Sequence, residues 1–372
     1  MRQDDARFMA RAVALARRGL GRTSPNPPVG AVVVRGGRIV GEGWHRRAGG
    51  PHAEVVALRR AGAAARGATL YVTLEPCSHF GRTPPCADAV IAARVGRVVV
   101  AVGDPNPRVR GRGLRALRAA GIRVDVGVLA NEAGAVSAWF RHFVVRRRPY
   151  VLLKLAASLD GRIATASGES RWVSGAAARR WVHALRNRVD AVMVGAGTVL
   201  ADDPALTCRI RGGRDPRRII VDGRLRVSPR AAVFRRGSAS PTIVVTTTAA
   251  SPHRRRALQR AGAEVVALPG RRGRVRMDAV LKALAARDVV SVLVEGGADL
   301  AATLLRERAV DRALVVSAPL LLGADGRAML AGLGVARLAS ALRLAQVTVT
   351  RLGPDVLWDG AVQYRGGAAI VR

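Results

Sequence analysis

The sequence predicts an α/β protein of two domains, the first of them a three-layer domain with helices on both faces of one sheet. The chain has 372 residues, about twice the length of an average domain, and 49% of them are hydrophobic, enough for two cores. In the first half, short β-branched segments alternate with helical segments. The second half continues this alternation and ends in successive strand patterns, so we expect a mixed α/β domain there.

The elements of the first half follow from hydrophobic spacing and turn residues. Residues 4–19 have the apolar spacing of a helix. Gly36 and Gly37 form a hairpin turn between strands 29–34 and 38–43. Pro51 marks the start of a helix at 52–63. The other elements expected in this half are strands 69–74, 97–102 and 122–128 and helices 87–93, 111–120 and 138–145.

An arginine run followed by Pro149 predicts the domain boundary. We therefore expect one domain over 1–147 and another over 148–372. The elements expected in the second domain are a buried strand after Pro149, helix 175–188, strands 190–194, 217–221, 242–246, 263–267 and 290–294, a helix from Ala298, and final strands 312–317, 346–351 and 355–359.

The net charge of +36 is unusual and comes almost entirely from arginine, since lysine occurs only at 154 and 282. Such a charge fits a nucleic-acid or phosphate partner. It also fits a solvated surface biased in composition, which we favour because the arginines are spread along the chain. Aromatic residues make up only 3% of the chain, too few for a base-stacking surface.

Cysteine usage and hydropathy indicate the cellular compartment of the protein. Three cysteines give no disulfide framework, and the amphipathic start of the chain does not have the pattern of a signal peptide. No apolar run is long enough to span a membrane. We expect a cytoplasmic protein.

Residues 49–86 combine potential metal ligands with a carboxylate. His52, Cys77 and Cys86 provide three zinc ligands and leave a fourth position open, as catalytic zinc sites do. In such sites zinc lowers the pKa of a bound water toward about 7. Glu54 lies two residues from the histidine, and H-x-E followed by P-C is typical of zinc deaminases. The alternative is a closed structural zinc site with His79 as fourth ligand, which would not need Glu54.

Two glycine turns in the second half each connect a strand to a helix. Residues 195–198 (GAGT) and 295–297 (EGG) have the geometry that suits a phosphate at a helix N-terminus, although a plain βα connection fits the first equally well. No GxGxxG motif with a following acid is present, so we expect no Rossmann dinucleotide fold. Arg186 and Arg209, before and after the first turn, are candidate phosphate ligands, with local Asp–Arg pairing as the alternative reading of 201–209.

Residues 1–145 resemble the cytidine and deoxycytidylate deaminase superfamily. The motifs on which this resemblance rests are TSPNPPVGAVVV, GGPHAEVVAL, PCSHFGRTPPC and DPNPRVRGRG. Ordinary members have PCxxC, whereas eight residues separate Cys77 from Cys86 here, which resembles the deaminase half of the bifunctional enzymes of riboflavin biosynthesis. The resemblance implies a cytidine-deaminase-like domain in which Asn26 and the 78–85 loop contact a pyrimidine substrate.

The second half resembles the reductase half of the same family, through KLAASLDGRIATASGESRW, GAGTVLADDPALT, VEGGADLAATLL and APLLLG. The resemblance implies a dihydrofolate-reductase-like fold. The NADPH contacts it implies are Ala156, Trp172, Thr198, Asp202, Gly297, Ala298, Asp299, Leu300, Ala301, Ala302 and Thr303. The substrate contacts it implies are Ser170, Arg186, Leu206, Arg209 and Glu295. It assigns no residue of 210–290, including whatever binds the 2′-phosphate of NADPH.

The function implied by the resemblance is bifunctional. The zinc domain removes the 2-amino group of 2,5-diamino-6-(5-phosphoribosylamino)pyrimidin-4-one, and the second domain reduces the ribosyl group to ribityl with NADPH. We expect a small-molecule substrate and no nucleic-acid or membrane partner, and leave a homo-oligomer open. One alternative is a zinc deaminase of tRNA or another nucleic acid with a binding domain. Another is a non-enzymatic, zinc-stabilised phosphate-binding protein.

Overall fold

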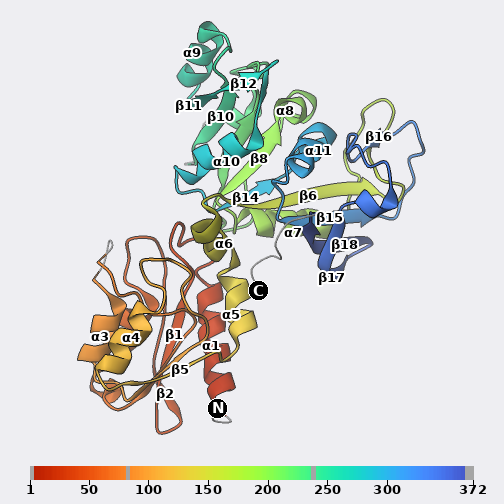
Figure 1. Ribbon diagram of the computed structural model, residues 1–372. Helices are drawn as coiled ribbons and strands as arrows, with labels where there is room; N and C mark the ends of the chain where they lie inside the picture. The colour runs from red at the N-terminus through yellow and green to blue at the C-terminus, as the bar shows by residue number, and fades with distance from the viewer. Residues whose placement is uncertain (1–3, 81–83, 236–239, 365–372) are drawn as a thin grey trace. The chain divides into compact units, whose positions relative to one another are not determined.

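The computed structural model describes residues 4–80, 84–235 and 240–364. Its contacts divide the chain into two compact units, Met1–Arg148 and Pro149–Arg372. Figure 1 shows a separate sheet in each unit. Both units are mixed α/β, so the predicted fold class is confirmed.

The first unit is built on a five-stranded sheet of order β2-β1-β3-β4-β5. Its strands are β1 (Gly30–Arg35), β2 (Arg38–Trp44), β3 (Thr69–Val72), β4 (Arg97–Val100) and β5 (Arg123–Val126). β1 is antiparallel to both β2 and β3, whereas β3, β4 and β5 are parallel. The carboxyl ends of these parallel strands lie at one edge of the sheet, where open α/β sheets bind ligands.

Helices cover both faces of this sheet. They are α1 (Asp5–Arg17), α2 (Ala53–Ala61), α3 (Cys86–Ala92), α4 (Arg112–Ala119), α5 (Ala130–Val136) and α6 (Ala138–Arg146). One apolar core joins α1 and α5 to the sheet, and a second joins α2, α3 and α4 to its other face. Three layers result, as predicted. The sequence reading missed α5, a seven-residue helix too short to show an apolar period.

Two glycines of β2 let α2 approach the sheet closely. A Cβ at Gly41 would lie 2.2 Å from the carbonyl oxygen of Ala57, and one at Gly43 would lie 2.4 Å from that of Ala53. No other residue fits there without moving the helix. Because His52 is the N-cap of α2 and Glu54 lies in its first turn, this packing fixes the depth of both side chains.

A buried ion pair ties α1 to the sheet. Arg97 donates to both carboxylate oxygens of Asp5 at 2.8 Å, and the two side chains are 8% and 1% exposed. The Tyr71 hydroxyl donates to the same carboxylate at 2.9 Å. Removing one member of such a pair leaves the other charge buried and poorly compensated. A substitution at Arg97 therefore tests how much this pair contributes to the stability of the first unit.

We expect Arg97→Met to lower the free energy of unfolding of the first unit by about 3–5 kcal/mol. Urea denaturation followed by circular dichroism measures the loss. The control is Arg11→Met, because Arg11 pairs with Glu42 at the surface, with side chains 42% and 24% exposed, and its loss should cost below about 1 kcal/mol. Equal costs for the two variants would contradict the importance of the buried pair.

The second unit contains a nine-stranded sheet of order β11-β10-β9-β8-β14-β6-β15-β18-β17. Its strands are β6 (Tyr150–Ser158), β8 (Ala191–Gly195), β9 (Arg217–Val221), β10 (Thr242–Thr247), β11 (Ala263–Leu268), β14 (Ser291–Val294), β15 (Arg312–Ala318), β17 (Arg343–Leu352) and β18 (Asp355–Gln363). From β11 to β15 neighbouring strands are parallel, and β18 and β17 add an antiparallel edge.

The remaining elements of this unit include helices and two small two-stranded sheets. The helices are α7 (Ala176–Arg186), α8 (Ala196–Asp202), α9 (Pro252–Arg260), α10 (Met277–Ala285) and α11 (Ala298–Arg306). The short strands are β7 (Arg162–Ala164) paired with β16 (Arg327–Ala328), and β12 (Gly270–Arg271) paired with β13 (Arg274–Val275). The sequence reading placed no element between 268 and 289, where α10 and β12–β13 lie. No helix of the described residues has the length and apolarity needed to cross a bilayer.

Candidate functional site

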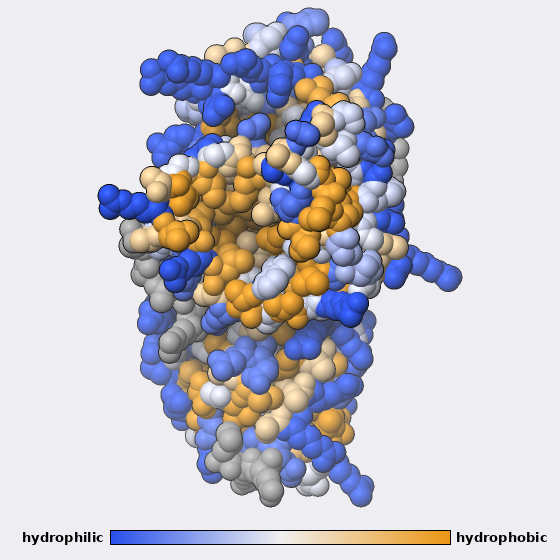
Figure 2. Space-filling view, turned by 90° about the vertical axis from the view of Figure 1, so that its right-hand side faces the viewer, coloured by the Kyte–Doolittle hydropathy of each residue, from blue (hydrophilic) through white to orange (hydrophobic). Residues whose placement is uncertain are grey.

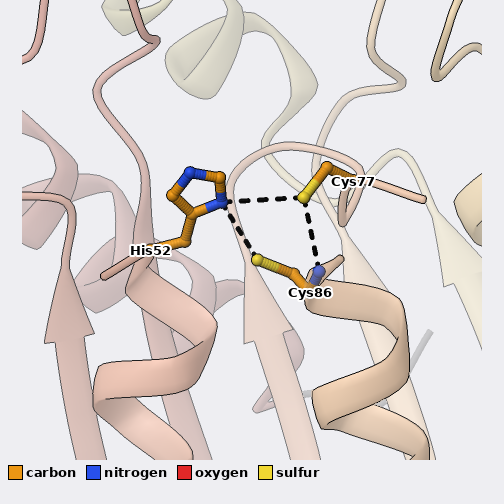
Figure 3. Close-up of side chains that lie close together, drawn as sticks. All are labelled: His52, Cys77 and Cys86. Atoms are coloured by element: carbon orange, nitrogen blue, oxygen red, sulfur yellow. Dashed lines mark hydrogen bonds between the residues drawn. The ribbon is translucent and has the colours of Figure 1, made fainter. Parts of the chain in front are cut away.

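Three elements of the first unit bring the predicted metal ligands together. His52 is the N-cap of α2, Cys77 follows β3, and Cys86 is the first residue of α3. The Nδ1 atom of His52 lies 3.0 Å from Sγ of Cys86 and 3.6 Å from Sγ of Cys77. Figure 3 shows the three side chains converging between the two helix N-termini. The backbone N–H of Cys86 also donates to Cys77 Sγ at 3.3 Å.

This donor set fits zinc. The three ligand atoms all lie within 4.8 Å of one another. A tetrahedral zinc with ordinary bond lengths sets N and S ligands about 3.5–3.8 Å apart. The separation of His52 from Cys77 matches this range, and that from Cys86 is about 0.5 Å shorter. Among the described residues no fourth ligand joins the cluster, and His79 is not part of it. The arrangement therefore matches a catalytic site with an open position better than a closed structural site.

Glu54 lies beside this cluster, in the first turn of α2, and is only 3% exposed. Burial raises the pKa of its carboxyl to about 7, although the nearby His52 opposes the shift. Hydrogen bonding with Cys86 lowers the pKa of Cys77 to about 4, and the same contact raises the pKa of Cys86. The structure thus places a buried carboxyl group next to the three candidate ligands, as the H-x-E spacing predicted.

The carboxylate of Glu75 anchors the segment that leads to Cys77. Its Oε1 accepts the backbone N–H of Gly113 at 3.1 Å, and its Oε2 accepts that of Gly111 at 3.0 Å. Asp104 also donates its backbone N–H, at 3.3 Å. These bonds join the DPNPRVRGRG segment and the start of α4 to the residue two positions before the cysteine. The sequence reading gave Glu75 no role, since these partners lie 29, 36 and 38 residues away.

Asn26 lies at the mouth of the sheet, and its amide contacts a histidine that the sequence reading overlooked. His45 Nδ1 lies 3.1 Å from the carbonyl oxygen of Pro51, which can only accept, so Nδ1 carries the proton. Nε2 therefore accepts from the Asn26 amide N–H at 3.2 Å. This orients the amide oxygen of Asn26 away from the histidine. The ring of His45 packs edge-on against His52, with centroids 5.1 Å apart. Of the 78–85 loop, residues 81–83 lie outside the described residues.

A cavity of about 1540 Å³ lies in the second unit. Its volume exceeds the usual 300–1,000 Å³ of a small-molecule site, so it has room for a dinucleotide beside a second ligand. Its lining includes most residues predicted to contact cofactor or substrate: Ala156, Ser170, Trp172, Arg186, Thr198, Asp202, Leu206, Arg209, Glu295, Gly297, Ala298, Asp299, Leu300 and Thr303. Ala301 and Ala302 do not line it. Both are fully buried, because they lie on the face of α11 that packs against the sheet.

A cluster of charged side chains lines this cavity. Arg186 donates through Nε and Nη2 to the two carboxylate oxygens of Glu295, at 2.7 and 3.0 Å. Burial pushes the pKa of Glu295 up, but Arg186 and Lys154 outweigh it and hold that pKa below its ordinary value. Burial lowers the pKa of Lys154, with Glu295 opposing. The carboxylate is thus held ionised between two cations.

The N-terminus of α11 opens onto the same cavity. Gly297 is its N-cap, and its backbone N–H donates to Thr198 Oγ1 at 3.1 Å, which joins the two glycine turns predicted from the sequence. The nearest atom to a Cβ at Gly297 would be that Oγ1, 3.6 Å away. Exposed N–H groups at a helix start suit a phosphate. Beside them, the Ser170 hydroxyl lies 3.5 Å from the carboxylate of Asp202.

Comparisons with known proteins assign a family to each half of the chain. Residues 2–102 match the cytidine and deoxycytidylate deaminase zinc-binding region, and residues 149–358 match the RibD C-terminal domain. The riboflavin biosynthesis protein RibD of Aquifex aeolicus is 43% identical, over 96% of this chain and 98% of its own. The Escherichia coli protein of the same name is 44% identical, over 95% and 98%.

Solved structures show the same likeness. Acinetobacter baumannii RibD is 39% identical with a TM-score of 0.88, over 97% of this chain and 99% of its own. A diaminohydroxyphosphoribosylaminopyrimidine deaminase/5-amino-6-(5-phosphoribosylamino)uracil reductase of Thermotoga maritima is 38% identical with a TM-score of 0.84, over 96% and 98%. The predicted resemblance, enzyme class and cofactors, Zn²⁺ and NADPH, are confirmed. The chain belongs to the RibD family of bifunctional riboflavin-biosynthesis enzymes, which join a zinc-dependent pyrimidine deaminase to an NADPH-dependent reductase.

Proposed function

We propose that residues 1–147 form the deaminase domain, with His52, Cys77 and Cys86 as zinc ligands and Glu54 as its acid–base residue. The observation that carries this assignment is the convergence of three soft ligands beside one buried carboxyl group. When bound, zinc supplies Lewis-acid chemistry and lowers the pKa of the water that attacks the pyrimidine.

Glu54 moves the proton in this mechanism. Its carboxylate accepts a proton from the attacking water and passes it to the ring nitrogen next to the reacting carbon. A second transfer to the amino group lets it leave as ammonia, and the carbon keeps the oxygen. Asn26 binds the pyrimidine, and the hydrogen bond from its amide to His45 leaves the amide oxygen to accept from a ring N–H or an amino group.

We place the reductase in residues 148–372. Gly297, Ala298 and the cavity-facing residues of α11 would hold a phosphate of NADPH, with Thr198, Asp202, Ala156 and Trp172 lining the rest of its site. When bound, NADPH supplies the hydride that reduces C1′ of the ribosyl group. Ser170, Arg186, Leu206, Arg209 and Glu295 are the substrate side of the cavity.

Opening and reducing the sugar also needs a proton. Asp202 and Glu295 are two carboxylates in the cavity lining. Glu295 is poorly suited, because Arg186 holds it ionised. Lys154 lines the same cavity near Glu295, and burial lowers the pKa of its ammonium group, which eases proton release, so we propose it as the donor.

Arg209 provides a test of the substrate side. It is exposed, lines the cavity, and its backbone N–H donates to His183 Nδ1 at 3.2 Å. We expect Arg209→Ala to raise the KM for the phosphorylated substrate tenfold or more, because a charge-assisted bond to phosphate is lost. The KM for NADPH should change less than about twofold in steady-state kinetics. Arg211→Ala is the control, since this exposed neighbour lies outside the cavity lining. Equal effects on both constants would count against the assignment.

We propose that the chain acts on small molecules without a nucleic-acid partner and works in the cytoplasm. All three cysteines are free, as suits a reducing compartment where thiolates bind zinc. A nucleic-acid partner predicts binding that weakens steeply as salt rises. Filter binding of tRNA and single-stranded DNA at several salt concentrations would reveal such a partner.

We also propose a homo-oligomer. β17 is an edge strand of the nine-stranded sheet, and edge strands invite pairing. Val349 on β17 is 57% exposed and Trp358 on β18 is 45% exposed. Figure 2 shows that apolar side chains gather on one face of the second unit. A monomer in light scattering at micromolar concentration would contradict this proposal.

A coupled assay tests the whole function. The diaminopyrimidine phosphate should release ammonia first, and NADPH should be oxidised only after that release. Zinc chelation should stop the first step while leaving reduction of the deaminated compound intact. Reduction of the substrate before deamination would contradict the proposed order.

A further inference from the structure

The segment that carries two of the predicted substrate contacts has no regular structure of its own. Residues 203–209, which follow α8, form neither helix nor strand. They include Leu206 and Arg209, both of which line the cavity. Leu206 has a φ of 54°, in the left-handed region that such a side chain rarely adopts. Contacts with the rest of the unit must therefore hold this segment in place.

The last turn of α7 supplies several of these contacts. Arg186 Nη1 donates to the carbonyl oxygen of Thr207 at 2.8 Å. The backbone N–H of Arg209 donates to His183 Nδ1 at 3.2 Å. The thiol of Cys208 lies 3.5 Å from the carbonyl oxygen of His183. Because His183 and Arg186 are three residues apart, they lie on one face of the helix, and the segment is fastened to that face.

The ring of His183 accepts a hydrogen bond in this contact, which requires an unprotonated Nδ1. A backbone N–H can only donate, so the proton of the neutral ring lies on Nε2. Burial lowers the pKa of His183, and the charges of Arg186 and Arg209 lower it further. Glu295 and the backbone of Thr207 oppose this shift without reversing it. The surroundings of the ring thus favour the neutral form, which can accept from Arg209.

This contact holds the backbone of Arg209 and leaves its guanidinium available. No ion pair joins Arg209 to an acidic side chain in the part of the chain that the structure describes. The side chain is exposed, and the residue lines the cavity, as Arg186 and His183 do. A long side chain loses conformational freedom when it binds a ligand, and a fixed backbone reduces that loss. The position of the backbone at Arg209 therefore affects how well its guanidinium can bind an anion.

We propose that His183 is a positioning residue of the reductase, which holds the backbone at Arg209 so that the guanidinium meets the phosphate of the substrate. The inference rests on the proposed binding of that phosphate by Arg209. The family resemblance gave His183 no role, and its imidazole need not touch the substrate to act in this way. Charge-assisted hydrogen bonds depend on distance and direction, so a shift of the backbone would weaken the contact with phosphate.

Three substitutions at His183 test the acceptor, with NADPH oxidation by the full-length zinc-loaded protein as the measurement. His183→Leu removes the acceptor and should raise the KM for the deaminated, phosphorylated substrate about three- to tenfold, because one hydrogen bond is lost. Its kcat and its KM for NADPH should change less than about twofold. His183→Asn keeps an acceptor oxygen close to the position of Nδ1, so its KM should stay within about twofold of the wild type. His183→Gln carries its amide nearer the position of Nε2 and should behave like His183→Leu.

A double-mutant cycle shows whether His183 acts through Arg209. Arg209→Ala keeps the backbone N–H that donates to His183 and removes only the guanidinium. In that background, His183→Leu should raise the KM by less than about twofold, because no guanidinium is left to position, whereas independent effects would multiply. The control is His253→Leu, which changes an exposed histidine of α9 outside the cavity lining and should match the wild type in every constant. Circular dichroism and ammonia release show that each variant folds.

Each outcome decides a separate point. If His183→Leu and His183→Gln both keep the wild-type KM, His183 has no positioning role and the proposal is wrong. If His183→Asn loses as much as they do, or if the effects of His183→Leu and Arg209→Ala multiply, His183 does not act through this hydrogen bond on Arg209. The proposal then also falls, while the assignment of the substrate side stands. If Arg209→Ala alone leaves the KM unchanged, the proposed binding of phosphate by Arg209 fails, and this inference fails with it.

Discussion

Replacing Glu54 by glutamine should reduce the rate of deamination about 10²–10⁴-fold while leaving zinc bound. Glutamine has the same shape and fills the same buried space, where Glu54 is 3% exposed. It cannot accept the proton of the attacking water, so both proton transfers are lost. The three ligands, His52, Cys77 and Cys86, are unchanged, so metal content should stay at one zinc per chain. Ammonia release and atomic absorption measure the two quantities.

The second activity of the chain is an internal control for this variant. Reduction of the deaminated substrate by NADPH should proceed at the wild-type rate, because that cavity belongs to the other unit. Glu132→Gln, an exposed carboxylate in the first turn of α5, controls for loss of charge. Undiminished deamination in a zinc-loaded Glu54→Gln protein would show that the mechanism is wrong.

The convergence of the candidate zinc ligands could be predicted from the sequence because these residues are close together in it. One short segment of the sequence contains His52, Glu54, Cys77 and Cys86. Each of these residues lies near the end of a helix or strand, and the sequence marks these ends, as Pro51 marks the start of α2. The residues that support the site escaped prediction. Glu75 and His45 act through backbone groups and an amide brought near by the fold, and no spacing rule identifies such partners.

The cavity of the second unit is formed by elements that are far apart in the sequence. Less of it could therefore be predicted from the sequence. The sequence showed its glycine turns and Arg186. It did not show that they lie together, because this depends on how β8, β14 and α7 are arranged in the folded unit. Ala301 and Ala302 belong to α11, the helix that lines the cavity, but both side chains are buried. A sequence motif does not distinguish the buried residues of a helix from those that face a cavity. The β12–β13 hairpin has strands of two residues each, too short for any alternation, so the sequence did not predict this hairpin.

Replacing Glu295 by glutamine should have the largest effect in the second unit. The pKa of Glu295 is lowered by both Arg186 and Lys154. In the ion pair of Arg186 with Glu295, the arginine side chain is 13% exposed and the glutamate side chain is 12% exposed. Glutamine leaves two cations buried without a carboxylate, which should cost about 3–5 kcal/mol of unfolding free energy. The reductase kcat/KM should fall about 100-fold or more, because the substrate side of the cavity loses its arranged charges. NADPH oxidation and urea denaturation measure these losses, and ammonia release from the first unit should be unchanged.

A double variant distinguishes stability from function at this cluster. Adding Arg186→Met to Glu295→Gln removes the unpaired guanidinium, and replacing both members of a buried pair is often close to neutral in stability. The double variant should therefore recover most of the lost unfolding free energy but none of the reductase activity. Asp278→Asn, which breaks the exposed Arg276–Asp278 pair, should cost below about 1 kcal/mol and leave both activities intact. If activity returned together with stability in the double variant, the pair would be structural only, and these charges in the cavity lining would have no part in substrate binding.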